Sequence, residues 1–216
     1  MEVSQKKIKG FTLLELMVVL AIVSIVSAIG FPNFNSWRSE RTVRVSAVNL
    51  SNLFTEVYSQ SQSSSYPFVQ VLIDSRNDEI VTIGNGISTD EYAQELYDTQ
   101  NQRLGCTIGD DVFWSQIRMR PFKSTDVLLS FADRVAVCFS KNTSHYAVNA
   151  ETSSFGGESI ILCLKRDMLR EGQPICDLAV LQNADTNYPA YQLEWSRFGS
   201  INLYKYNHIN NAWNLQ

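Results

Sequence analysis

The chain has 216 residues, with 18 Lys and Arg against 22 Asp and Glu and a formal net charge of −4. This balance argues against broad affinity for nucleic acids, which requires a basic surface. Two local basic groups are interpreted as solvated loop charges, so DNA binding is kept only as a minor alternative. Their members are Arg118, Arg120 and Lys123, and Lys165, Arg166 and Arg170.

An apolar run extends from Phe11 to Phe31 and contains a single carboxylate, Glu15. A helix of this length covers about 31 Å at 1.5 Å per residue, the thickness of a bilayer core. An ionisable group in hydrocarbon costs roughly 2.5–3.5 kcal/mol, so we expect Glu15 to have a partner. Three lysines precede the run and no Lys or Arg follows until Arg38. The positive-inside tendency therefore predicts a cytoplasmic N-terminus and an exported remainder.

This N-terminus resembles that of type IV prepilins and of the pseudopilins of type II secretion. The resemblance rests on Gly-Phe-Thr-Leu-Leu-Glu at 10–15, the apolar run and Pro32, and it covers about 35 of the 216 residues. It implies that a membrane-bound prepilin peptidase and methyltransferase cuts between Gly10 and Phe11 and methylates the new N-terminal Phe11. Residues 1–10 are then a leader peptide.

The resemblance also implies where the protein resides and what it contacts. A single-pass subunit is held in inner-membrane lipid with its head in the periplasm, and then passes through an inner-membrane assembly platform into a pilus or pseudopilus. Its partners there are other pilins or pseudopilins in a helical filament.

Two other interpretations of the N-terminus stay open. A secretory signal has an apolar core of roughly 7–15 residues and small residues before the cut. Val26-Ser27-Ala28 would satisfy the second requirement, but the run is longer than such a core. A plain signal anchor would ordinarily avoid an acid at the position of Glu15.

The chemistry of Glu15 predicts a role in assembly. Cleavage after Gly10 creates a positive amine at Phe11, which the carboxylate can reach within its own subunit or on a neighbour in the filament. Leaving one of these ions alone in a low-dielectric surround would cost several kcal/mol, roughly 3–5. We therefore expect Glu15 to set the register in which a subunit leaves the bilayer for the filament.

One long helix is expected from about Thr12 to about Ser61, with an apolar half at 11–35 that serves as transmembrane segment and filament core. Gly30 and Pro32 favour a kink or a locally melted turn at the end of this half. An amphipathic pattern then resumes and belongs to an extracytoplasmic head at 36–216. Its apolar positions are Trp37, Val45, Val48, Leu53, Val57 and Tyr58.

The Ser/Gln-rich stretch at 59–67 ends the helix, and short strand-like segments follow. A capping box at Ser88–Glu91 predicts a short helix at about 90–100. With the resemblance, this pattern implies an α+β, type IV pilin-like fold in which the long helix packs on an antiparallel sheet. The expected strands are 68–73, 80–83, 127–131, 135–139, 145–149, 160–164, 178–181, 191–195 and 201–206.

The four cysteines all lie in the exported head, where disulfides are the default. They are Cys106, Cys138, Cys163 and Cys176. Four cysteines allow three pairings, and we favour Cys163 with Cys176 and Cys106 with Cys138 because the first pair brackets a polar loop. The spacing of the cysteines and of His145 and His208 does not suit zinc.

Catalytic motifs are missing from the sequence, so we expect no enzyme, no cofactor and no bound metal. Asp74, Asn77, Asp78 and Glu79 lack the ligand spacing and glycine of a calcium loop and are interpreted as a polar hairpin turn. Asp110 and Asp111 are likewise interpreted as a solvated turn.

The expected function is that of a structural subunit of a type IV pilus. A head longer than a minimal pilin needs favours a minor pilin in pilus assembly, adhesion, twitching motility or DNA uptake. A pseudopilin of type II secretion is the alternative within the resemblance. An anchored or secreted binding module without a filament role is the alternative outside it.

Overall fold

The computed structural model describes residues 11–63, 65–76, 79–90, 114–140, 145–149, 159–183, 187–196 and 199–216, with the backbone only at 28–33 and 145–149. The chain divides into two compact units, Met1–Ser39 and Glu40–Gln216. Each unit is described by itself.

Helix α1, Leu13–Ser61, runs through both units. It confirms the long helix expected from about Thr12 to Ser61. The backbone is helical at Gly30 and Pro32, so the melted turn that these residues favour is not present. The helix continues through both residues despite their weak helix propensity. A kink at this point stays a prediction.

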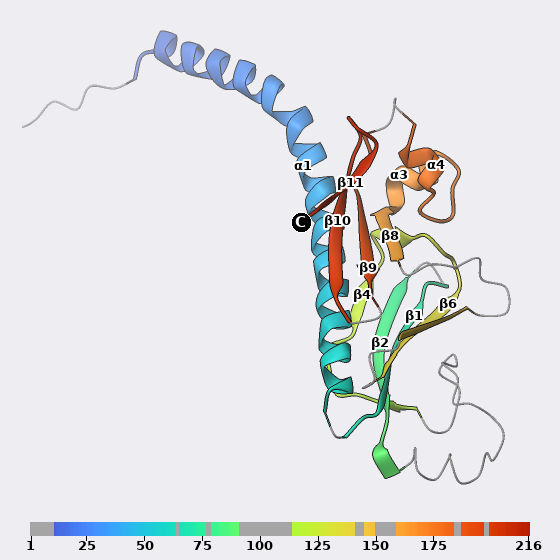
Figure 1. Cartoon of the computed structure of the whole chain (residues 1–216). Helices are drawn as coiled ribbons and strands as arrows, with labels where there is room; N and C mark the ends of the chain where they lie inside the picture. The colour runs from blue at the N-terminus through green and yellow to red at the C-terminus, as the bar shows by residue number, and fades with distance from the viewer. Residues whose placement is uncertain are drawn as a thin grey trace, which may run out of the picture. The chain divides into compact units, whose positions relative to one another are not determined.

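The head, Glu40–Gln216, combines the second half of α1 with strands that form two antiparallel sheets within the described residues (Figure 1). Sheet A has the order β3-β2-β1-β6-β7, and β4 also pairs with β2. Its strands are β1 (Phe68–Asp74), β2 (Ile80–Ile87), β3 (Ser115–Gln116), β4 (Phe122–Ser124), β6 (Arg134–Ser140) and β7 (His145–Asn149).

Sheet B has the order β11-β10-β9-β8-β5. Its strands are β5 (Val127–Leu129), β8 (Ser159–Leu164), β9 (Ala190–Trp195), β10 (Ile201–Asn207) and β11 (Ala212–Leu215). Two short helices, α3 (Lys165–Arg170) and α4 (Leu178–Leu181), lie between β8 and β9 in the chain. The prediction of an α+β head with antiparallel strands is confirmed, and the fold is consistent with a type IV pilin.

The core of the head is built from one face of α1 and the inward faces of both sheets. Alternate residues of β1 point into it, as the period of two in a strand requires: Val69, Val71 and Ile73 are fully buried among α1 side chains and sheet B. The α1 side chains in this core are Val43, Ala47, Leu50, Leu53, Phe54 and Val57. Lys205 of β10 adds an ion pair with Glu40 of α1.

The hairpin between β9 and β10 approaches α1 closely at Gly199. This glycine has a φ of +75°, and a Cβ atom there would lie 1.9 Å from Cζ of Tyr58. Only glycine combines this left-handed backbone with the absence of a side chain. Gly199 therefore permits the β9–β10 connection to pack on the helix.

One predicted strand is wrong. Residues 178–181 form α4, because Asp177 accepts a hydrogen bond from the backbone N–H of Ala179 at 2.8 Å and caps a helical turn. A short apolar run cannot by itself separate strand from helix. The second expected helix is helical at Thr89 and Asp90, and the rest of it, 91–100, lies outside the described residues.

Candidate functional site

The N-terminal turn of α1 is organised by Thr12 and Glu15. The backbone N–H of Glu15 donates to Oγ1 of Thr12 at 3.2 Å, and the backbone N–H of Thr12 donates to Oε2 of Glu15 at 3.3 Å. The Thr12 hydroxyl donates to the same carboxylate oxygen at 3.4 Å. This reciprocal pattern is a capping box, which satisfies two N–H groups that the helix leaves without partners.

Thr12 belongs to the motif on which the resemblance rests, but its capping role was not predicted from the sequence. The Thr-x-x-Glu spacing at 12–15 was the signal for it, since a Ser or Thr three residues before Glu is typical of a helix start. The box places Glu15 in the first turn, where the helix dipole also favours a negative charge.

Residues 11–26 of the first unit expose a largely apolar surface. Side chains on all sides of α1 from Leu13 to Val26 are exposed, including Leu13 at 77% and Val26 at 64%. Phe11, two residues before the first residue of α1, is 84% exposed. A helix that is apolar all round is stable only where lipid or other apolar side chains surround it.

Among the residues whose side chains are described, no helix meets the length and hydropathy of a membrane span.

Comparison with protein families found a match at residues 5–31 to the model of the prokaryotic N-terminal methylation motif. The chain carries a prepilin-type methylation motif. This motif is consistent with the superfamily of type IV prepilins and pseudopilins. Comparison with curated proteins and with solved structures gave no match.

The methylation motif contains every predicted processing residue. Gly10 lies outside the described residues, and Phe11 is the first residue that the structure describes. Glu15 lies within the motif and accepts both hydrogen bonds from Thr12. Gly30 also lies within the motif, and Pro32 follows its end. The cut between Gly10 and Phe11 and the roles of these residues in assembly remain predictions.

The predicted disulfide between Cys163 and Cys176 is present, with the two Cα atoms 5.7 Å apart. It joins the end of β8 to the residue before Asp177 and so encloses α3. Cys138 on β6 is also disulfide-bonded, and its predicted partner Cys106 lies outside the described residues. No described cysteine is free.

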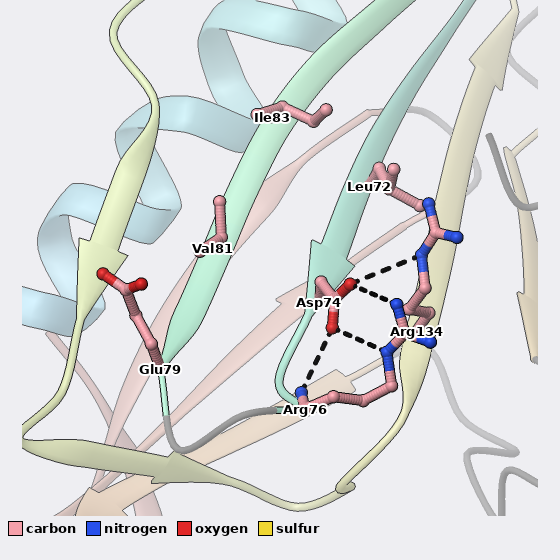
Figure 2. A pocket seen from close by; sticks show the side chains of 7 residues that line it. All are labelled: Leu72, Asp74, Arg76, Glu79, Val81, Ile83 and Arg134. Carbon is pink, nitrogen blue, oxygen red and sulfur yellow. Dashed lines mark hydrogen bonds and ion pairs between the residues drawn. The ribbon is translucent and has the colours of Figure 1, made fainter. Parts of the chain in front are cut away.

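A second candidate site is a pocket on the outer face of sheet A (Figure 2). Leu72 and its cross-strand neighbour Ile83 lie on the face of the sheet opposite the α1 core. Arg134 at the start of β6 is the register partner of Asp74 at the end of β1. The pocket has a volume of about 280 Å³ and is lined by Leu72, Asp74, Arg76, Glu79, Val81, Ile83 and Arg134. We call it the charged pocket.

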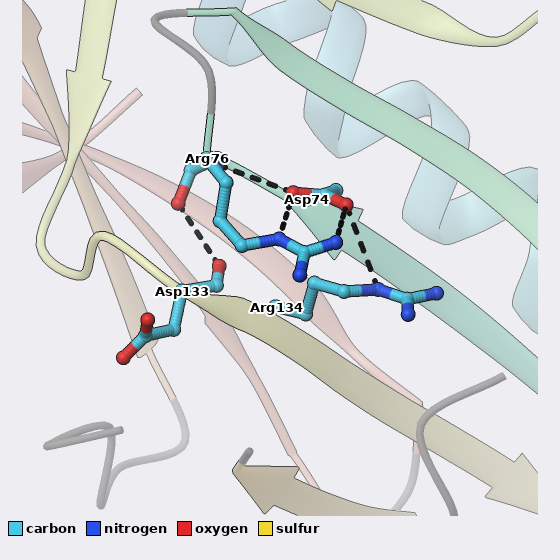
Figure 3. Close-up of polar contacts among 5 residues, drawn as sticks. Asp74, Arg76, Asp133 and Arg134 are labelled. Carbon is cyan, nitrogen blue, oxygen red and sulfur yellow. Dashed lines mark hydrogen bonds and ion pairs between the residues drawn. The ribbon is translucent and has the colours of Figure 1, made fainter. Parts of the chain in front are cut away.

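Asp74 holds both arginines of the charged pocket (Figure 3). Its carboxylate accepts from Nε and Nη2 of Arg76 at 3.0 and 2.7 Å, and Nε of Arg134 lies 3.5 Å away. The hydrogen bond from the Arg76 side chain is the main cause that lowers the pKa of Asp74, and partial burial opposes it. Asp74 therefore stays ionised and fixes two guanidinium groups at one end of the pocket.

The adjoining loop is fixed to the start of β6. The Ser75 hydroxyl donates to the carbonyl oxygens of Phe131 and Asp133 at 3.2 and 3.0 Å. Asp74 and Glu79 belong to the segment interpreted as a polar hairpin turn, and its other two residues, Asn77 and Asp78, lie outside the described residues. Across the described residues, no group of three or more His, Cys, Asp or Glu side chains is placed to hold a metal ion. Asp110 and Asp111 lie outside the described residues.

Proposed function

We propose that this protein is a non-enzymatic structural subunit of a type IV pilus, and specifically a minor pilin. The observation that carries the proposal is the methylation motif at 5–31, which supports a pilin or pseudopilin type of protein. It coincides with a helix whose apolar side chains are exposed on every side. A filament core requires an apolar helix that other helices can bury. It also requires the positive amine that cleavage creates at the start of this helix.

The proposed life cycle has a membrane stage and a filament stage. The lysines of the leader keep the N-terminus in the cytoplasm, and lipid covers the apolar half of α1 while the head lies in the periplasm. Prepilin peptidase then removes residues 1–10 and methylates Phe11. The assembly platform moves the subunit into the filament, where apolar helices of neighbouring pilins replace the lipid.

The carboxylate of Glu15 guides this transfer. The capping box holds it in the first turn of α1, close in sequence to the new amine at Phe11. A subunit enters the filament where the amine and an acid meet, because leaving either ion unpaired is the costly state.

The size of the head supports a specialised subunit rather than the bulk building block. The head, Glu40–Gln216, holds two antiparallel sheets and the short helices α3 and α4 in addition to the second half of α1. Such a minor pilin serves assembly, adhesion, twitching motility or DNA uptake. The same motif is found on pseudopilins, so a type II secretion role is the second candidate.

The test separates these two roles by phenotype. The gene is deleted in its own host, and surface fibres are counted by electron microscopy while secreted folded enzymes are assayed in the medium. We expect loss or reduction of fibres, and an epitope-tagged copy recovered with the sheared fibres. Normal fibres together with a failure of enzyme export would assign the chain to secretion instead.

A further inference from the structure

The charged pocket combines an apolar floor with charges of both signs. Leu72, Val81 and Ile83 form the apolar part. Arg76 and Arg134 share Asp74 at one side, and Figure 2 shows Glu79 standing apart from this cluster. A complementary ligand needs an acid for the arginines, a base for Glu79 and an apolar group for the floor.

The volume of the pocket is about 280 Å³, at the lower end of ligand sites, which span roughly 300–1,000 Å³. The pocket is also open, and its Arg76 side chain is 51% exposed. It has room for one apolar side chain, with flanking charged side chains reaching the rim.

Within its described residues, the head presents one segment with this chemistry. Its described large apolar side chains that are exposed are Val45, Val48, Leu169, Leu178, Ile209 and Leu215. Among these six, only Leu169 has both a basic and an acidic exposed residue within two positions, namely Arg170 and Glu171. Val48, Ile209 and Leu215 have no Lys, Arg, Asp or Glu within two positions, Val45 has only a base nearby and Leu178 only an acid. Each of these five would match fewer of the pocket charges than Leu169 and its neighbours.

Leu169, Arg170 and Glu171 form a projection that we call the α3 knob. Leu169 is 55% exposed at the end of α3, while the preceding Met168 is fully buried and anchors the helix. The Tyr188 hydroxyl donates to Oε1 of Glu171 at 2.7 Å and holds this carboxylate in place. The Cys163–Cys176 disulfide closes the loop that carries the knob. The knob is thus preorganised for binding, which reduces the entropy lost on association.

The knob and the pocket lie on different sheets of the head. Met168 packs with Cys163, Ala190 and Tyr206 in a cluster separate from the main core, on sheet B. The charged pocket is on the outer face of sheet A, where Leu72 belongs to another cluster. A contact between them therefore joins two molecules.

We propose that the α3 knob of one copy inserts into the charged pocket of a second copy of this chain. Leu169 covers the apolar floor, Glu171 faces the arginine pair, and Arg170 faces Glu79. Different patches meet in this contact, so it is heterologous. The inference rests on the proposed filament role and names the contact between heads within it.

Photo-cross-linking of the full chain in its own membrane tests the contact. Leu169 is replaced by p-benzoylphenylalanine, and Leu178, an exposed leucine without a neighbouring base, is replaced likewise as a control. We expect a product of twice the subunit mass from position 169 only, with the cross-link mapped to β1 or β2. No such product, or a cross-link to a different protein, overturns the proposal.

A charge exchange provides the second arm. Glu79→Lys leaves the Asp74–Arg76–Arg134 cluster intact and should reduce the cross-link about fivefold to tenfold. Arg170→Glu in the same chain should restore it, whereas Arg118→Glu, a reversal at an exposed arginine elsewhere, should not. Thermal unfolding of each variant is measured to ensure that the head is folded. A folded Glu79→Lys variant with an undiminished cross-link contradicts the proposal.

The same samples separate failure of the contact from failure of the proposed function. Sheared fibres are collected from each strain and probed for the chain. A chain that enters fibres without the 169 cross-link refutes the knob–pocket contact and leaves the filament role standing. If the chain is never found in fibres, the filament role is refuted. The mapped cross-link from position 169 then shows independently whether the knob of one copy contacts the pocket of another.

Discussion

Substitutions of Glu15 separate its two roles, because the carboxylate both caps α1 and carries a charge. Glu15→Ala removes the capping hydrogen bonds and the charge together. Glu15→Gln retains a side chain that can complete a capping box but has no charge. Thr12→Ala is the matched control, since it removes the hydroxyl partner of the cap and leaves the carboxylate in place.

The two roles differ in magnitude. Loss of a cap costs about 1 kcal/mol, which corresponds to roughly a fivefold change in an equilibrium. An ion left alone in a buried site costs about 3–5 kcal/mol, a factor of about 150 or more. If pairing with the Phe11 amine guides assembly, Glu15→Ala and Glu15→Gln should both reduce incorporation by at least about 100-fold. Thr12→Ala should reduce it by about fivefold or less.

The assay measures each variant in sheared fibres relative to the amount left in the inner membrane. All variants should still be inserted and cut, because the leader and Gly10 are unchanged and the loss of a charge makes the helix more apolar. Incorporation of Glu15→Gln at the wild-type level would refute the pairing argument and leave capping as the only role of Glu15. Equal defects in Thr12→Ala and Glu15→Ala would lead to the same conclusion.

Three further predictions concern the head. Gly199→Ala should lower the free energy of unfolding by about 2–5 kcal/mol, because of backbone strain and a clash with the ring of Tyr58. Gly172 has a φ of +72° and open space around it, so Gly172→Ala should lower the free energy of unfolding by only about 1–2 kcal/mol. Equal losses for the two variants in urea unfolding would contradict the clash. Cys163→Ser should leave Cys176 reactive to alkylation without reduction and lower stability by about 3 kcal/mol, so an unreactive thiol would argue against the pairing. The pKa of Asp74 is lower in the folded head than its ordinary value of 3.8, so the ionised carboxylate stabilises the head at every pH above 3.8, and this contribution is lost as the pH falls through the folded pKa. Asp74→Asn should therefore destabilise the head at neutral pH and make no difference at a pH below the folded pKa. A difference in stability that does not change with pH would contradict the ion-pair account.

The long helix was predictable because its signals are local and periodic. The apolar run begins at Phe11 and the amphipathic pattern continues to Ser61, so length and spacing alone define α1. The same pattern does not predict whether the helix continues through Pro32. The low helix propensity of proline favours a break there, whereas the helical segments on both sides favour a continuous helix. The methylation motif was equally accessible, since its residues are fixed at set offsets in one segment.

The charged pocket was not predictable from the sequence. Asp74 and Glu79 were assigned to a polar turn, and only the register of β1 with β6 brings Arg134 opposite Asp74. Register depends on contacts between segments that are far apart in the chain. The division of the head into two sheets and the helical state of residues 178–181 also depend on such long-range packing.

The central claim is that this chain is processed as a prepilin, and the mature N-terminus tests it most directly. Intact and N-terminal-peptide mass spectrometry of the membrane-associated protein should show a chain that begins at N-methyl-Phe11. Gly10→Ala or a bulkier residue at this position should leave the leader attached. A mature chain that begins at Ile29 would indicate ordinary signal peptidase and contradict the account, as would a wild-type chain that retains residues 1–10.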